Sequence, residues 1–72
     1  MKLEKALPLL RQGKSISRIN KSWYHALLIV ELQFGSTLRF KYVYKSGKEQ
    51  DWRYYKFSNG DLLADDWEIV NG

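Results

Sequence analysis

The chain of 72 residues contains no cysteine, one histidine, one methionine and one proline. Without cysteine there can be no disulfide and no thiolate metal site, and His25 alone cannot build a zinc site, so we expect neither a metal nor another cofactor. The apolar run 26–30 ends at Glu31, far short of the roughly 18 residues that a membrane-spanning helix needs. Residues 1–14 carry Glu4 and lack a cleavage site typical of a signal peptide. We therefore expect a cytoplasmic protein without a membrane partner.

The small size of the chain favours self-association. A domain of this length buries only about 60% of the surface of its unfolded chain, and small proteins usually gain stability from disulfides, a metal or further copies. The first two routes are excluded, so we expect a homo-oligomer. Twelve Lys and Arg against eight Asp and Glu give a net charge of +4; residues 1–30 contain six bases and one acid, whereas residues 58–72 contain four acids and no base. This asymmetry can attract phosphate or bring unlike ends of two copies together, or it can be a solvated surface of mixed charge.

Hydrophobic spacing predicts one helix at the N-terminus. Leu3, Ala6, Leu7 and Leu10 recur at helical intervals, and Gly13 follows as a terminating residue, which indicates a helix over 3–12. Pro8 predicts a kink or a late start of this helix.

Alternation and turn residues predict strands in the rest of the chain. We expect a short strand over 14–19 and a hairpin of 26–34 with 37–45. A three-residue turn over 35–37 would pair Phe34 with Leu38, Leu32 with Phe40, Val30 with Tyr42 and Glu31 with Lys41.

A second hairpin should turn at 46–48 into 51–57, with Trp52 and Tyr54 facing inward. A helical turn over 61–64 and a strand over 67–70 complete one domain over 1–72. The predicted fold class is α+β, with one N-terminal helix packed on a four- to five-stranded antiparallel sheet.

No catalytic constellation is recognisable in the sequence. His25 has no cysteine partner and no serine marked by a nucleophile motif, and the sequence at Gly13-Lys14-Ser15 lacks the upstream glycine of a phosphate-binding loop. Asp65 and Asp66 are adjacent, so a strand would point them to opposite faces. We expect a binding protein rather than an enzyme.

The C-terminal sequence reads Asp61-Leu62-Leu63-Ala64, an acidic residue, then Asp66-Trp67, and Tyr55 and Ser58 stand shortly before it. It resembles the ending of the phage and prophage Thoeris anti-defence 2-like family, in which Tyr55 and Ser58 match the preceding positions, whereas Phe57 replaces a proline. Leu3, Ala6-Leu7, Gly13-Lys14, Arg18 and Trp23 match the N-terminal pattern in order and approximate spacing. The central part departs from the resemblance, since many members carry an insertion where this chain has tight turns at 35–36 and 46–47.

The resemblance implies a small α+β homo-oligomer that binds a cyclic or modified ADP-ribose signal between subunits and so starves a bacterial defence effector. The residues that we expect to contact such a ligand are Arg18, Trp23, Tyr24 and Asp61, because a nucleotide needs an aromatic surface, cationic donors and acceptors for ribose. Each residue also has a structural interpretation: Trp23 as a cap on the core, Arg18 as a solvated cation and Asp61 as the cap of the helical turn.

Two other functions fit the sequence. The family also includes anti-CRISPR proteins, so the chain can be an inhibitor that docks on a host defence protein through a basic sheet face. Alternatively, Arg39, Lys41, Arg53 and Lys56 share strands with tyrosines, as in modules that bind single-stranded nucleic acid. A charged outer sheet face would show the same mixture.

Overall fold

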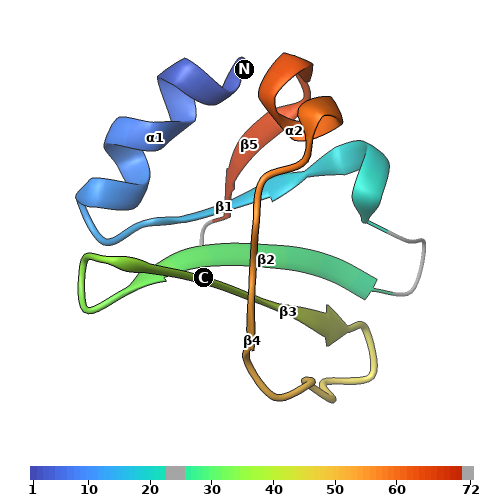
Figure 1. Cartoon of the computed structure of the whole chain (residues 1–72). Coiled ribbons are helices and arrows are strands. Elements are labelled where there is room, and N and C mark those ends of the chain that lie inside the picture. The colour runs from blue at the N-terminus through green and yellow to red at the C-terminus, as the bar shows by residue number, and fades with distance from the viewer. Residues whose placement is uncertain (23–25, 71–72) are drawn as a thin grey trace.

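The computed structural model describes residues 1–22 and 26–70 and shows a helix packed on one face of a five-stranded antiparallel sheet (Figure 1). The strand order is β4-β3-β2-β1-β5. The α+β class and the N-terminal helix on an antiparallel sheet are therefore confirmed. In chain order, the elements are α1 (Leu3–Arg11), β1 (Ser15–Arg18), the 3-10 turn η1 (Ile19–Lys21), β2 (Ala26–Gln33), β3 (Thr37–Tyr44), β4 (Arg53–Tyr54), α2 (Asn59–Leu63) and β5 (Trp67–Val70).

Helix α1 follows from the spacing of its apolar residues. Leu3, Ala6 and Leu10 are buried on the face that meets the sheet. The helix ends at Arg11, and Gly13 adopts a φ of +85°, a conformation that glycine reaches without a steric penalty. Pro8 lies inside the helix on its exposed side, so the prediction of a late start is wrong.

The register predicted for the long hairpin is wrong by two residues. The observed pairs are Leu32 with Leu38, Val30 with Phe40 and Leu28 with Tyr42, and Glu31 lies opposite Arg39 rather than Lys41. The turn has three residues, as predicted, but it covers 34–36 because Phe34 and Gly35 adopt the positive φ values of 53° and 75°. A shift of two preserves the side-chain parity, so both apolar rows still face α1.

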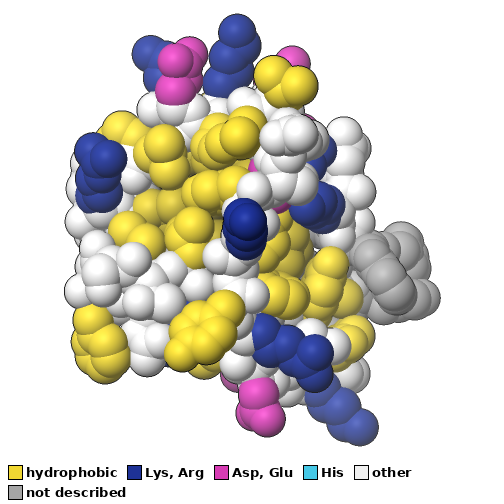
Figure 2. Space-filling view, viewed as in Figure 1, with side chains coloured by type: hydrophobic (Ala, Val, Ile, Leu, Met, Phe, Trp, Pro, Cys, Tyr) yellow, Lys and Arg dark blue, Asp and Glu magenta, His cyan; other side chains and the backbone are white. Residues whose placement is uncertain are grey.

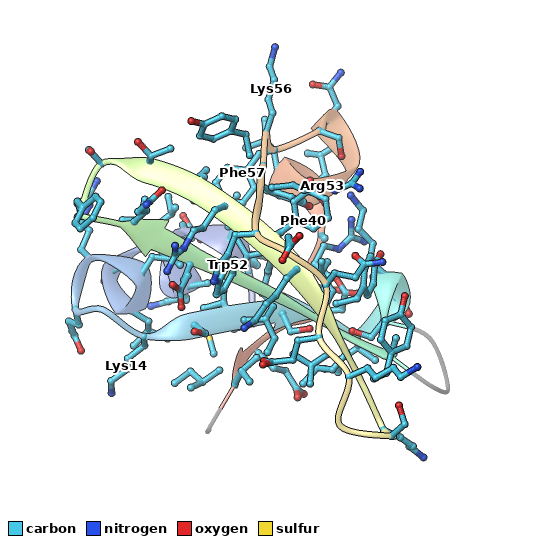
Figure 3. All side chains as sticks on the ribbon, turned by 90° about the horizontal axis from the view of Figure 1, so that it is seen from below. Lys14, Phe40, Trp52, Arg53, Lys56 and Phe57 are labelled. Carbon is cyan, nitrogen blue, oxygen red and sulfur yellow. The ribbon has the colours of Figure 1, made fainter. Side chains whose placement is uncertain are left out.

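The inward pair predicted for the second hairpin is also wrong. Strand β4 contains only two residues, and Tyr54 is 83% exposed. The aromatic side chains that pack against the core are Tyr55 and Phe57 instead. Trp52 lies over the outer face of the sheet, the face opposite α1 (Figure 3).

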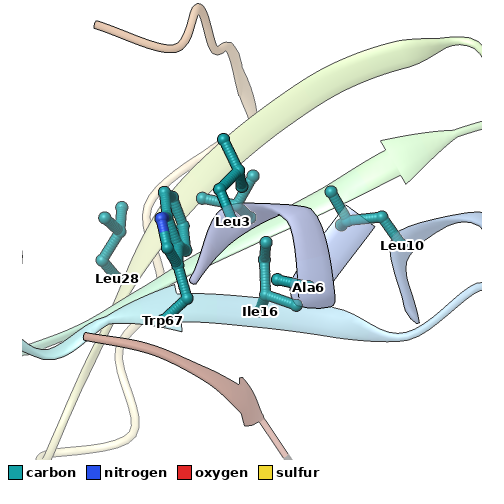
Figure 4. Close-up of a cluster of buried hydrophobic side chains, with 7 residues drawn as sticks. Leu3, Ala6, Leu10, Ile16, Leu28 and Trp67 are labelled. Atoms are coloured by element: carbon teal, nitrogen blue, oxygen red, sulfur yellow. The ribbon is translucent and has the colours of Figure 1, made fainter. Parts of the chain in front are cut away.

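Trp67 closes the core between the sheet and the helices. Its side chain is fully buried together with Ile16, Leu28 and Val30, beside the buried face of α1 (Figure 4). Helix α1 does not cover the whole inner face of the sheet. Apolar side chains therefore remain at the surface between α1 and β3 (Figure 2). This pattern fits a chain too short to bury all of its apolar residues.

Candidate functional site

Arg18 and Asp61, two of the residues singled out from the sequence, form the centre of a polar cluster where β1 ends. Arg18 Nη1 donates to Asp61 Oδ1 over 2.8 Å, and Arg18 Nε donates to Asp66 Oδ1 over 3.0 Å. Lys21 Nζ reaches Asp61 Oδ1 at 2.8 Å. The two cations face two carboxylates, so the cluster is balanced in charge.

The remaining contacts of Asp61 tie this cluster to α2 and to the core. Its Oδ2 accepts from the Tyr55 hydroxyl at 2.8 Å and from the Ser58 backbone N–H at 2.9 Å. Its backbone carbonyl accepts from Trp67 Nε1 at 3.0 Å. The carboxylate has no exposed surface, and its partners satisfy it from four directions.

The sequence suggested Asp61 as the N-cap of α2, and this prediction is wrong. Ser58 is the N-cap, and its hydroxyl accepts from the Asp61 backbone N–H at 3.2 Å. Asp61 is the third helical residue and completes a reciprocal capping box by accepting from the Ser58 N–H. The helix therefore begins at Asn59, two residues earlier than predicted.

The cluster fixes the ionisation of its members. Burial is the largest single influence on the pKa of Asp61 and raises it, but hydrogen bonds from Lys21, the Ser58 backbone, Arg18 and Tyr55 outweigh burial and hold that pKa well below its usual value. Hydrogen bonding to Asp61 is in turn the largest influence on the pKa values of Arg18 and Lys21, which are both raised. All three groups are charged at neutral pH.

Lys21 and Tyr55 form the more accessible side of the cluster. Lys21 Nζ donates to the Tyr55 hydroxyl at 3.2 Å and lies 5.6 Å from the centroid of the tyrosine ring, and its side chain is 37% exposed. Tyr42 approaches the same turn, since its hydroxyl donates to the Lys21 carbonyl at 3.3 Å. Trp23 and Tyr24, the other two predicted ligand contacts, lie outside the described residues.

A small hollow of about 80 Å³ lies next to this turn, at the start of β2. Its lining residues are Ala26, Tyr42, Tyr44 and Gln50. Gln50 Nε2 donates to the Tyr44 hydroxyl at 2.9 Å. Two tyrosines, an amide and the nearby Lys21 therefore lie at one end of the sheet.

Sequence reasoning missed the roles of Tyr55 and Asp66 in this cluster. Both belong to the motif that carries the family resemblance, but a motif gives no information about which side chains meet. The positions Tyr55, Ser58 and Asp61 recur at intervals of three residues, and this spacing was the available signal. Trp67, the last residue of the motif, is fully buried and packs in the core.

Within the ranges 1–22 and 26–70, no group of three or more His, Asp or Glu side chains is arranged to hold a metal ion. In the same ranges no helix is long and apolar enough to cross a membrane.

Comparison with known proteins agrees with the sequence motif. The model of the Thoeris anti-defense 2-like domain matches residues 1–70, almost the whole chain. No curated protein matches the chain in a sequence comparison. The matched region includes Arg18, Asp61 and Asp66, the residues that form the polar cluster. The chain therefore belongs to the Thoeris anti-defense 2-like family, and this membership supports a role in phage anti-defence.

Proposed function

We propose that the protein binds and sequesters a nucleotide-derived immune signal of the cyclic ADP-ribose type, without catalysis, inside the host cell. The observation that carries this proposal is the grouping of Lys21, Tyr55 and the Tyr42–Tyr44 hollow at one end of the sheet. Ammonium and guanidinium groups bind phosphates, and flat aromatic rings bind bases.

Arg18 and Asp61 contribute to this proposed site in different ways. Because their charged groups pair with each other, Asp61 holds Arg18 and Lys21 in place. Lys21 is the more exposed cation and can turn from Asp61 to a ligand phosphate without leaving the carboxylate unpaired, since Arg18 remains bound to it. Arg18, Asp61, Trp23 and Tyr24 stay the proposed site residues, with Asp61 acting through the cations that it holds, and Lys21 joins them.

We further propose that the site is completed by a second copy of the chain. The hollow of about 80 Å³ is far smaller than the roughly 300–1,000 Å³ typical of ligand pockets, so one chain encloses too little of a dinucleotide-sized signal. A homo-oligomer that places two such ends together would provide the missing walls. Size-exclusion chromatography with light scattering should show an assembly larger than the 8.6 kDa chain.

Isothermal titration calorimetry with cyclic ADP-ribose and linear ADP-ribose tests the ligand class. We expect saturable binding, and we expect mass spectrometry to recover the ligand unchanged after heat denaturation of the complex. Lys21→Met should weaken binding about tenfold through loss of one charge-assisted hydrogen bond. Lys48→Met, which removes the same charge from the exposed 45–48 turn, should leave the affinity unchanged. No heat with either ligand, or a converted ligand, would contradict sequestration.

A second candidate function is inhibition by docking on a host defence protein. The observation that favours it is the exposure of Leu62 and Leu63 on α2, at 57% and 86%. These leucines border a hollow of about 260 Å³ with Lys2, Leu3 and Glu4. The basic sheet face considered from sequence is less suited to docking on an acidic patch, because Arg39 and Lys41 are paired with Glu31 and Glu49. Capture of a host protein by the wild type and not by Leu63→Ser would support docking.

A further inference from the structure

A separate hollow of about 300 Å³ opens at the edge of the sheet where β4 pairs with the first half of β3. Its lining residues are Gln33, Arg39, Trp52, Arg53 and Tyr54. Among these described residues there are two guanidinium groups, two aromatic rings and one amide, but no carboxylate. Its volume falls at the lower limit of small-molecule pockets.

The sheet register explains why these side chains meet. Tyr54 pairs with Arg39, so both point to the outer face. Trp52 shares that face because it lies two residues before Tyr54. Arg53 pairs with Phe40, so the register directs it toward the side of α1, and it lines the hollow from the edge of the sheet (Figure 3). The side chains thus come from the sequence-distant segments β3 and β4 and the end of β2.

Arg39 and Trp52 line the hollow and pack against each other. The Arg39 guanidinium carbon lies 4.1 Å from the centroid of the Trp52 ring, and Nε and Nη2 of Arg39 both donate to Glu31 Oε1. Glu31 therefore fixes the plane of the guanidinium but uses only two of its three nitrogens. Nη1 has no acceptor among the described residues and is available to a ligand.

Arg53 and Tyr54 supply the accessible groups. Both are exposed, and neither side chain has a partner in the described part of the chain. Tyr54 is 83% exposed, which leaves an apolar ring in contact with water. Together the two residues offer a stacking surface, the Tyr54 ring, and a phosphate donor, the Arg53 guanidinium.

We propose that this hollow binds one nucleoside monophosphate unit, with its base stacked on Tyr54 and its phosphate bound by Arg53 and Arg39. The unit can be a free nucleotide or part of a single strand, because the recognised chemistry is the same in both. This site is separate from the one at Lys21 and does not depend on it.

Titrations with AMP, adenosine, inorganic phosphate and a ten-residue oligothymidylate test the proposal. We expect AMP to bind at least fivefold more tightly than adenosine or phosphate, since neither fragment uses both the ring and the guanidinium groups. Tighter binding of the oligomer than of AMP, with a loss of affinity at higher salt, would identify a single strand as the source. In either case ligand should shift the amide signals of Arg53 and Tyr54 in a nuclear magnetic resonance titration.

Two variants locate the binding. Arg53→Met and Tyr54→Ala should each reduce the affinity at least fivefold while leaving the melting temperature unchanged, because both residues are exposed. Arg11→Met is the matched control, since it removes one exposed arginine from α1 on the opposite side of the sheet. No binding of AMP or the oligomer, or binding that both variants retain, would overturn the proposal. Binding lost in Lys21→Met and kept in Arg53→Met would assign the nucleotide to the first site alone.

Discussion

Asp61 is the only charged side chain that is fully buried in the described part of the chain. Asp61→Asn removes the carboxylate charge that Arg18 and Lys21 face, while the Arg18 side chain stays largely buried. Loss of one partner from a buried ion pair typically costs about 3 kcal/mol or more. We expect urea denaturation to show a loss of about this size. Asp65→Asn, at an exposed acid four residues away, should change the unfolding free energy by less than about 0.5 kcal/mol. Equal effects of the two variants would contradict the structural role of Asp61.

Tyr55 tests the same cluster without changing its charge. Its hydroxyl donates to Asp61 and accepts from Lys21, so Tyr55→Phe removes two contacts and keeps the ring that packs against Phe40 and Phe57. We expect a cost of about 1.5 kcal/mol in unfolding free energy, the range for a hydrogen bond to a charged group. The cost should shrink strongly in the background of Asp61→Asn, because the main acceptor is already weakened. Additive effects in this double-mutant cycle would show that the two residues act independently.

At the scale of elements, Trp52 is a side-chain contact between the segment 45–54 and the outer face of β3. Strand β4 has only two residues, but Arg39 and Lys41 lie 4.1 Å and 4.5 Å from the centroid of the Trp52 ring. Trp52→Ala should therefore loosen residues 45–54 and cost about 1–2 kcal/mol through two lost cation–π contacts. Hydrogen exchange should accelerate at the Gln50 amide, which donates to the Tyr42 carbonyl. Tyr54→Ala should leave that amide protected.

The turn of the long hairpin carries a conformational cost at Phe34. Its φ is 53° and its side chain is 93% exposed, so neither backbone preference nor burial accounts for phenylalanine there. Asparagine adopts this conformation more readily. Phe34→Asn should raise the unfolding free energy by about 0.5–1 kcal/mol, measured at a protein concentration low enough to keep the chain monomeric. A decrease would contradict a conformational cost at Phe34.

The elements show how far the sequence alone could lead. The spacing of Leu3, Ala6 and Leu10 predicted α1, because helical periodicity is a local property. Which side chains of β2 and β3 face α1 was also predictable, because apolar residues alternate along both strands. The exact register was not, because a shift by two residues keeps every side chain on the same face and so does not change the hydrophobic pattern. The site was predictable only in part. The family resemblance led to Arg18 and Asp61, but their contact joins positions 43 residues apart and depends on the whole fold.

At the scale of the whole molecule, the lowered pKa values of two carboxylates make the free energy of unfolding depend on pH in the acidic range. The pKa values of Asp61 and Asp66 are both lowered in the folded state. Unfolding restores ordinary values, so the unfolded chain binds more protons in acid and the folded state loses stability as the pH falls. The contribution should be complete above about pH 5 and decline steadily below about pH 4. Melting temperatures between pH 7 and pH 2.5 should fall more steeply for the wild type than for Asp61→Asn. Parallel curves would mean that Asp61 titrates alike in both states.

The Asp61 cluster also bears on how a compact chain of this kind can change its target. The hydrogen bonds of this cluster hold the end of β1, α2 and β5 together. The residues that make them are Arg18, Tyr55, Ser58, Asp61, Asp66 and Trp67. All six belong to the pattern that carries the family resemblance. The motif is thus in large part a specification of the scaffold. Of the proposed site residues, Arg18 and Asp61 belong to the motif, whereas Lys21, Arg53 and Tyr54 lie outside it. Proteins that share the motif should keep one architecture while their surfaces diverge, and an evolving phage can replace surface residues without disturbing the core that it depends on.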